Sequence, residues 1–136
     1  MGRILAIDYG KKRIGLAVTD ELQLIASPFD IYHNNHELFG KLKKLHSSYR
    51  FEKIVIGLPY SETYQEATRA VMDFAENLKK EIELPIEYQN EEFSSIYAES
   101  LLKSTGKNQK QIRESIDKYA AYKILNDYLK SNPNKN

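Results

Sequence analysis

The stretch Arg3-Ile-Leu-Ala-Ile-Asp-Tyr-Gly-Lys-Lys-Arg-Ile-Gly-Leu-Ala-Val-Thr-Asp20 decides the fold, because it predicts two strands joined by a tight, basic turn. Residues 4–7 are continuously apolar, which is typical of a strand buried on both faces. The run stops at Asp8, and a carboxylate at the end of a buried strand is unfavourable unless a cation, a hydrogen bond or water satisfies it. We interpret Asp8 as a metal ligand at the mouth of a nuclease-like site. The alternative is that Asp8 caps a turn, and Asp-x-Gly alone does not exclude it.

The turn after Asp8 is rich in positive charge. Gly10 and Gly15 bracket Lys11, Lys12 and Arg13, so the turn can bring backbone and cations close to an anion. A second basic segment, residues 103–113, contains four basic residues and no acidic one. For both segments the alternative is a solvated loop. We rate them above other lysine clusters because they lie close in sequence to acidic positions. The residues expected to hold a nucleic-acid backbone are Lys11, Lys12, Arg13, Lys107, Lys110 and Arg113.

Length and composition indicate one ordinary globular domain. The 136 residues are 41% hydrophobic and 29% charged, and residues 131–136 are expected to be a frayed tail. The net charge of +1 gives a weak overall field, so a nucleic-acid binder must concentrate its basic residues locally. The absence of cysteine excludes disulfides, zinc–thiolate sites and thiol nucleophiles. Neither a signal peptide nor a membrane-spanning run is visible, so we expect a cytoplasmic protein with no membrane partner.

The rest of the chain alternates between strand and helix patterns. Residues 22–33 predict a third strand interrupted at Pro28, and Asn35 is expected to cap the next helix. The remaining expected elements are a buried strand at 54–59, a long helix capped at Ser61, a short strand at 86–89, a helix that carries Ile96, Leu101 and Leu102 and stops at Gly106, and a final helix at about 115–130. Short connections predict an antiparallel meander for the first three strands, and helical crossovers predict that later strands run parallel to the first. The result is a ribonuclease H-like α/β fold, with a mixed five-stranded sheet and helices on both faces.

Three places supply carboxylates that can converge at one end of this sheet. Asp8 ends the first strand, the acidic pair at 91–92 follows the last strand, and Asp117 is expected in the first turn of the last helix. Ala121 and Ile124 follow Asp117 at helical spacing, so Asp117 lies on or beside the inward face. One explanation for an acid there is stabilisation by the helix N-terminus. The other is that it points at the carboxyl ends of the strands, where open α/β sheets place their sites.

Clustered carboxylates suit phosphodiester hydrolysis with Mg²⁺ or Mn²⁺. These hard cations prefer oxygen ligands, keep some of their waters and bind phosphate oxygens. One ion can activate a water while a second, about 4 Å away, stabilises the leaving oxygen. Two or three carboxylates are sufficient because the substrate completes the coordination.

Four segments, in order, resemble the motifs of the YqgF family, which is related to RuvC. They are residues 7–17, 54–59, 90–95 and 116–125, and together they span nearly the whole chain. Members are described as pre-16S rRNA nucleases or Holliday junction resolvase-like proteins. The resemblance implies a ribonuclease H-like fold, metal-dependent nuclease chemistry, a cytoplasmic location and a role in 5′-end maturation of ribosomal RNA.

The resemblance also implies site residues. Asp8 and Asp117 match the family motifs directly. In the third motif, Asn90 replaces the family's aspartate and Glu92 its arginine, whereas Glu91 matches its glutamate. The resemblance therefore implies Glu91 as the third catalytic and metal-binding carboxylate.

Two alternatives to an RNA nuclease stay open. One is a resolvase-like endonuclease that acts on branched DNA, and the other is a nucleic-acid-binding module with little catalysis. The expected partner is therefore structured RNA or branched DNA, bound by a monomer or a homodimer. A nucleotide-phosphate-binding fragment of a two-domain kinase-like fold is disfavoured because the chain is too short.

Overall fold

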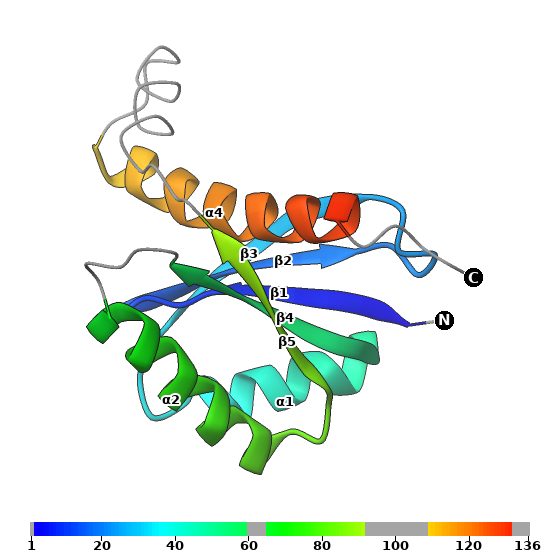
Figure 1. Ribbon diagram of the computed structural model, residues 1–136, viewed down its shortest axis with the longest axis horizontal. Coiled ribbons are helices and arrows are strands. Elements are labelled where there is room, and N and C mark those ends of the chain that lie inside the picture. The colour runs from blue at the N-terminus through cyan, green and yellow to red at the C-terminus, as the bar shows by residue number, and fades with distance from the viewer. Residues whose placement is uncertain (1, 60–64, 92–108, 132–136) are drawn as a thin grey trace.

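The computed structural model describes residues 2–59, 65–91 and 109–131. In these segments five strands form one sheet. Helix α4 (Gln109–Ser131) covers one face, and helices α1 (Leu38–Tyr49) and α2 (Gln65–Glu81) cover the other (Figure 1). This arrangement confirms the predicted mixed five-stranded sheet with helices on both faces. The predicted cap at Ser61, the helix around residues 96–102 and its stop at Gly106 lie outside the described residues. No helix in the described segments is long and apolar enough to cross a membrane.

The sheet has the strand order β3-β2-β1-β4-β5. The strands are β1 (Arg3–Asp8), β2 (Arg13–Thr19), β3 (Ala26–His33), β4 (Phe51–Pro59) and β5 (Ile86–Glu91). β1, β2 and β3 pair antiparallel, whereas β4 runs parallel to both β1 and β5, as predicted. The carboxyl ends of β1, β4 and β5 therefore meet at one edge of the sheet. The last residues of these strands are Asp8, Pro59 and Glu91.

The continuous apolar run of β1 is buried on both faces because helices cover both. Leu5 and Ile7 belong to the core between the sheet and the helices α1 (Leu38–Tyr49) and α2 (Gln65–Glu81). Ile4 and Ala6 point to the other face and pack in the core beneath α4 (Gln109–Ser131). Asp8 continues this second series by alternation, so its side chain lies on the face that α4 covers.

The third strand differs from its prediction. It begins at Ala26, and residues 22–25 form a turn instead of strand because the Asp20 carboxylate accepts three backbone N–H groups from Leu22, Leu24 and Ile25. An aspartate that bonds nearby backbone groups competes with a strand ladder. Pro28 lies inside β3, next to the register shift that its missing N–H explains.

Two helix starts also differ from their predictions. Asn35 does not cap α1, because its side chain bonds the Glu37 N–H at 3.0 Å and closes a turn before the helix begins. The final helix begins at Gln109 rather than near 115, so residues 109–113 of the basic segment are helical. This places Asp117 two turns inside α4, away from the N-terminus.

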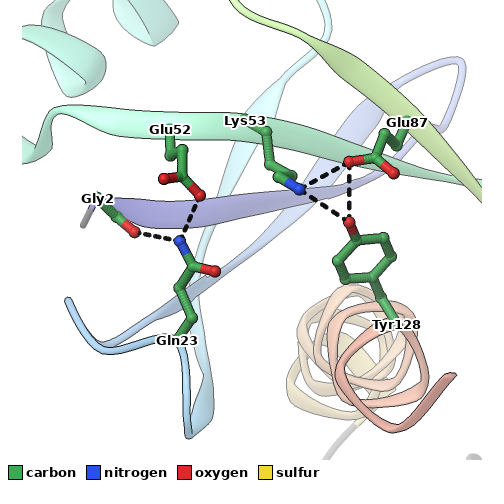
Figure 2. Close-up of polar contacts among 6 residues, drawn as sticks. All are labelled: Gly2, Gln23, Glu52, Lys53, Glu87 and Tyr128. Atoms are coloured by element: carbon green, nitrogen blue, oxygen red, sulfur yellow. Dashed lines mark hydrogen bonds and ion pairs between the residues drawn. The ribbon is translucent and has the colours of Figure 1, made fainter. Parts of the chain in front are cut away.

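Polar contacts clamp the far end of α4 to the sheet (Figure 2). Tyr128 on α4 donates its hydroxyl to Glu87 at 2.9 Å, and Lys53 contacts the same carboxylate at 2.9 Å. Lys53 also donates to the Tyr128 hydroxyl at 3.1 Å. This triangle fixes the helix over β4 and β5, and thereby sets where its preceding turns lie above the strand ends.

Candidate active site at the strand ends

Asp8 lies where α4 comes closest to the sheet. It pairs with Gly15 on β2, and a Cβ on Gly15 would overlap the backbone carbonyl of Asp117. Only a glycine permits this approach of the helix. Gly15 therefore brings the backbone of Asp117 to the strand that neighbours Asp8.

The carboxyl group of Asp8 is in an environment that disfavours its negative charge. Its pKa is raised from 3.8 to about 7, first by burial and then by the charges of Asp117 and Glu91. Within the described residues, Asp8 makes no ion pair with a lysine or arginine. The charges of Asp117 and Glu91 thus act on Asp8 at this edge of the sheet.

Glu91 is the last residue of β5 and is buried, with 7% of its surface exposed. The alternation of side chains along a strand places its neighbour Asn90 on the opposite side, where it is exposed. The Glu91 Oε1 atom is buried and has no hydrogen-bond partner among the described residues. Burying a carboxylate oxygen without a hydrogen-bond partner costs free energy, so a ligand bound to this atom would stabilise the site.

Asp8 and Glu91 line the same pocket. It has a volume of about 200 Å³ and is otherwise lined by Tyr9, Gly57, Pro59, Val71 and Ile124. β4 lies between β1 and β5, so the carboxylates of Asp8 and Glu91 face the pocket from the two sides of β4. Space for the pocket exists because Gly57 has no side chain, and a Cβ there would overlap Ile124. The pocket therefore contains the carboxylates of Asp8 and Glu91 in a lining that is otherwise mostly apolar.

Asp117 does not line this pocket, and its carboxylate is paired with an arginine. Arg13 donates from Nε to Asp117 Oδ2 at 2.6 Å, and both side chains are about a quarter exposed. Because α4 begins at Gln109, the helix N-terminus does not explain Asp117, and that alternative from the sequence is wrong. Arg13 is its partner instead, 104 positions away in the chain.

The predicted nucleic-acid-binding residues are only partly described. Lys11 and Lys12 are exposed on the turn between β1 and β2. Asn34 ties that turn to the end of β3 through hydrogen bonds to the carbonyls of Gly10 and Lys12, each at 2.8 Å. Lys107 lies outside the described residues. Lys110 and Arg113 belong to α4, which continues past Asp117, but their side chains are not described.

Lys123 and Asp127 on α4 are neighbours of the site that sequence reasoning missed. Lys123 lies 3.4 Å from Glu91 Oε2 and 2.8 Å from Asp127 Oδ2. The pKa of Glu91 is raised from 4.5 to about 7 by burial and by Asp127, and Lys123 opposes this rise. In the sequence the two α4 residues look like a surface pair at i and i+4. Only the fold adds the third member, Glu91.

The carboxylates of Asp8 and Glu91 are suitable ligands for a hard divalent cation, but they do not form a complete coordination shell. Within the described residues, no group of three or more acidic, histidine or cysteine side chains is arranged to hold a metal ion together. Asp8 and Glu91 share the pocket, whereas Asp117 is bound to Arg13. Mg²⁺ commonly binds one or two carboxylates and completes its shell with water and phosphate oxygens. The unpartnered Glu91 Oε1 and the raised pKa of Asp8 both favour a cation here.

Comparison with known proteins decides the family. Residues 2–131 match the RuvX family, described as Holliday junction resolvase and also called YqgF. The chain belongs to the RuvX family. A relative from Sulfurihydrogenibium sp. (strain YO3AOP1), named "Putative pre-16S rRNA nuclease", is 41% identical over 95% of this chain and 90% of its own. A relative of the same name from Dechloromonas aromatica (strain RCB) is 35% identical over 96% and 92% of the two chains.

Solved structures agree on the fold of this RuvX protein. Thermus thermophilus RuvC in complex with a Holliday junction substrate superimposes with a TM-score of 0.55 at 11% identity, covering 97% of both chains. The fowlpox virus Holliday junction resolvase gives a TM-score of 0.54 at 11% identity, covering 95% of this chain and 99% of the viral one. The fold is therefore ribonuclease H-like, as predicted.

Proposed function

We propose that this RuvX protein is a metal-dependent nuclease that acts in the cytoplasm on pre-16S rRNA, in maturation of its 5′ end. The observation that carries the proposal is the shared pocket of Asp8 and Glu91, two carboxylates whose pKa values are both raised to about 7. Two such acids facing one pocket are unfavourable as anions unless a cation binds. The names of the relatives supply the substrate.

Asp8 and Glu91 would hold Mg²⁺ or Mn²⁺, and Asp117 would be the third carboxylate ligand. When bound, such an ion activates a water molecule and stabilises charge on phosphate oxygens. Asp8 supplies a carboxylate at the end of a rigid central strand, which fixes the position of the site. Arg13 holds Asp117 through Nε and keeps its remaining N–H donors for a substrate phosphate.

The basic turn would bind the RNA backbone beside the pocket. Lys11 and Lys12 are exposed on a turn that Asn34 fixes in place, so their charges are presented from a defined position. Lys107, Lys110 and Arg113 are proposed to extend this contact. Binding through lysine and arginine releases counterions, so affinity should fall as salt rises.

The runner-up function is cleavage of branched DNA. The description of the RuvX family favours it, since it names a Holliday junction resolvase. The two functions share the same carboxylates and differ only in substrate. A catalytically weak binding module is the third candidate, and it would bind nucleic acid without metal-stimulated cleavage.

The deciding experiment compares two substrates under the same conditions. A 5′-extended 16S rRNA precursor and a four-way DNA junction are each incubated with the protein, with Mn²⁺ or with EDTA. We expect Mn²⁺-dependent cleavage of the RNA at a rate at least about tenfold above that of the junction. Faster junction cleavage would favour the resolvase, and binding without cleavage of either substrate would favour the binding module.

Asn90 is expected to be dispensable although it replaces the family's aspartate. Its side chain is exposed and points away from the side of β5 that carries Glu91. We therefore predict that Asn90→Asp changes the Mn²⁺-dependent cleavage rate by less than about threefold, while Glu91→Gln lowers it by about a hundredfold or more. Single-turnover rates on the same RNA measure both. A large gain in rate for Asn90→Asp would mean that position 90 belongs to the site.

A further inference from the structure

Among the residues that the structure describes, Lys123 is the lysine that contacts Glu91, and the proposed function does not yet assign it a role. It lies on α4, six residues beyond Asp117, and reaches across to β5. Its Nζ is 3.4 Å from Glu91 Oε2, and Asp127 one turn further along holds the same Nζ at 2.8 Å. The ammonium group therefore sits between two carboxylates, one on the helix and one at the strand end.

The two oxygens of Glu91 are treated differently by their surroundings. Oε2 has Lys123 as its partner, whereas Oε1 is buried with no partner among the described residues. A carboxylate held at one oxygen cannot rotate freely, so the other oxygen keeps a defined position. Asp127 in turn limits where Lys123 can move. Asp127, Lys123 and Glu91 thus form a series of contacts that ends at the unpartnered Oε1 atom of Glu91.

We propose that Lys123 is a positioning residue that holds Glu91 by Oε2 and leaves Oε1 as the oxygen for the metal ion. This inference rests on the proposed function, because it assumes that a divalent cation binds between Asp8 and Glu91. Residues that orient a metal ligand through a hydrogen bond typically change metal affinity by about 10- to 100-fold when they are removed.

A simpler role for Lys123 predicts the opposite sign. If Lys123 were only a nearby positive charge, it would repel the ion, and its removal would tighten metal binding. If it positions Glu91, its removal leaves a buried carboxylate without its partner and weakens metal binding. The direction of the change therefore separates the two roles.

The test measures Mn²⁺ affinity by electron paramagnetic resonance on the full-length protein, with thermal unfolding in EDTA as the check on folding. We expect Lys123→Met to weaken Mn²⁺ binding at least about tenfold and Lys123→Arg, which keeps charge and donors, to stay within about threefold of wild type. Lys130→Met, on an exposed position of the same helix, is the matched control and should bind as wild type does. Lys123→Gln replaces Lys123→Met if the latter does not fold.

Two different failures can be told apart. Unchanged or tighter Mn²⁺ binding in Lys123→Met, with wild type binding normally, overturns the role of Lys123 and leaves the proposed nuclease intact. An equal loss of affinity in Lys123→Met and Lys123→Arg also overturns it, because positioning by a cation should be rescued by arginine. Absence of Mn²⁺ binding in wild type overturns the proposed metal site itself, and this role with it.

Discussion

Asp8→Asn is expected to abolish Mn²⁺-dependent cleavage and, in the absence of metal, to raise the stability of the fold at pH 8. The loss of activity follows from removing the central carboxylate ligand. An ion that stabilises transition-state charge contributes several kcal/mol, so the cleavage rate should fall by about 10³-fold. Single-turnover cleavage of the RNA precursor measures it.

The gain in stability follows from the raised pKa of Asp8. The folded protein binds this proton with a pKa of about 7, whereas the unfolded chain binds it near 3.8. The folded state therefore holds more protons between these values, so Asp8 makes the protein less stable as the pH rises from about 4 to 7. One pKa unit corresponds to about 1.4 kcal/mol. Because Asp8 keeps some contact with solvent, part of this shift is screened, and we expect Asp8→Asn to gain about 1–3 kcal/mol at pH 8.

Thermal unfolding in EDTA at several pH values tests this prediction. The gain should be largest near pH 8, shrink as the pH falls through 7, and vanish only below about pH 3, where the folded and the unfolded wild-type chain both carry the proton. Asp73→Asn, on an exposed position of α2, is the control and should show no such trend. A lower melting temperature for Asp8→Asn at pH 8 would make Asp8 a structural residue. Wild-type cleavage by the variant would remove it from the site.

Gly15→Ala is expected to destabilise the protein by about 2–4 kcal/mol and to reduce cleavage in whatever fraction remains folded. The new Cβ would overlap the backbone carbonyl of Asp117 and approach the side chain of Ala121. Backbone cannot move aside as a flexible side chain can, so α4 as a whole must shift away from β2. That shift carries Asp117 and its contact with Arg13 away from the strand end.

Gly40→Ala provides a matched control for Gly15→Ala. Gly40 lies on an exposed position of α1, and a Cβ there meets no atom within 4 Å. Alanine is favoured over glycine inside a helix, so this variant should gain about 0.5–1 kcal/mol. Chemical denaturation of both variants gives the comparison. A stability for Gly15→Ala equal to that of wild type would show that α4 does not depend on close contact with β2.

Much of the fold was predictable because it depends on local patterns. The apolar run of β1, the similar run of β4 and the short connections of the meander were enough to predict the sheet and its direction changes. The expected helix start near 115 was wrong because Gly106 and a run without acidic or apolar periodicity looked like a loop. That error also placed Asp117 at a helix N-terminus, where it does not lie.

The contacts of the site were less predictable because they join distant parts of the chain. The Arg13–Asp117 ion pair spans 104 positions, and no local pattern links the two. Lys123 looks like a surface residue until β5 places Glu91 beside it. Gly57 was visible only as a strand end, although its missing side chain opens the space between Asp8 and Glu91. Each of these features depends on how two secondary-structure elements pack against each other, which the sequence periodicity does not predict.

The most direct test of the central claim is a crystal structure of the protein soaked in Mn²⁺, with anomalous scattering to locate the ion. The account predicts a peak in the pocket within coordination distance of both Asp8 and Glu91, with Glu91 Oε1 as a ligand. An ion bound elsewhere, with these two carboxylates free, would contradict it.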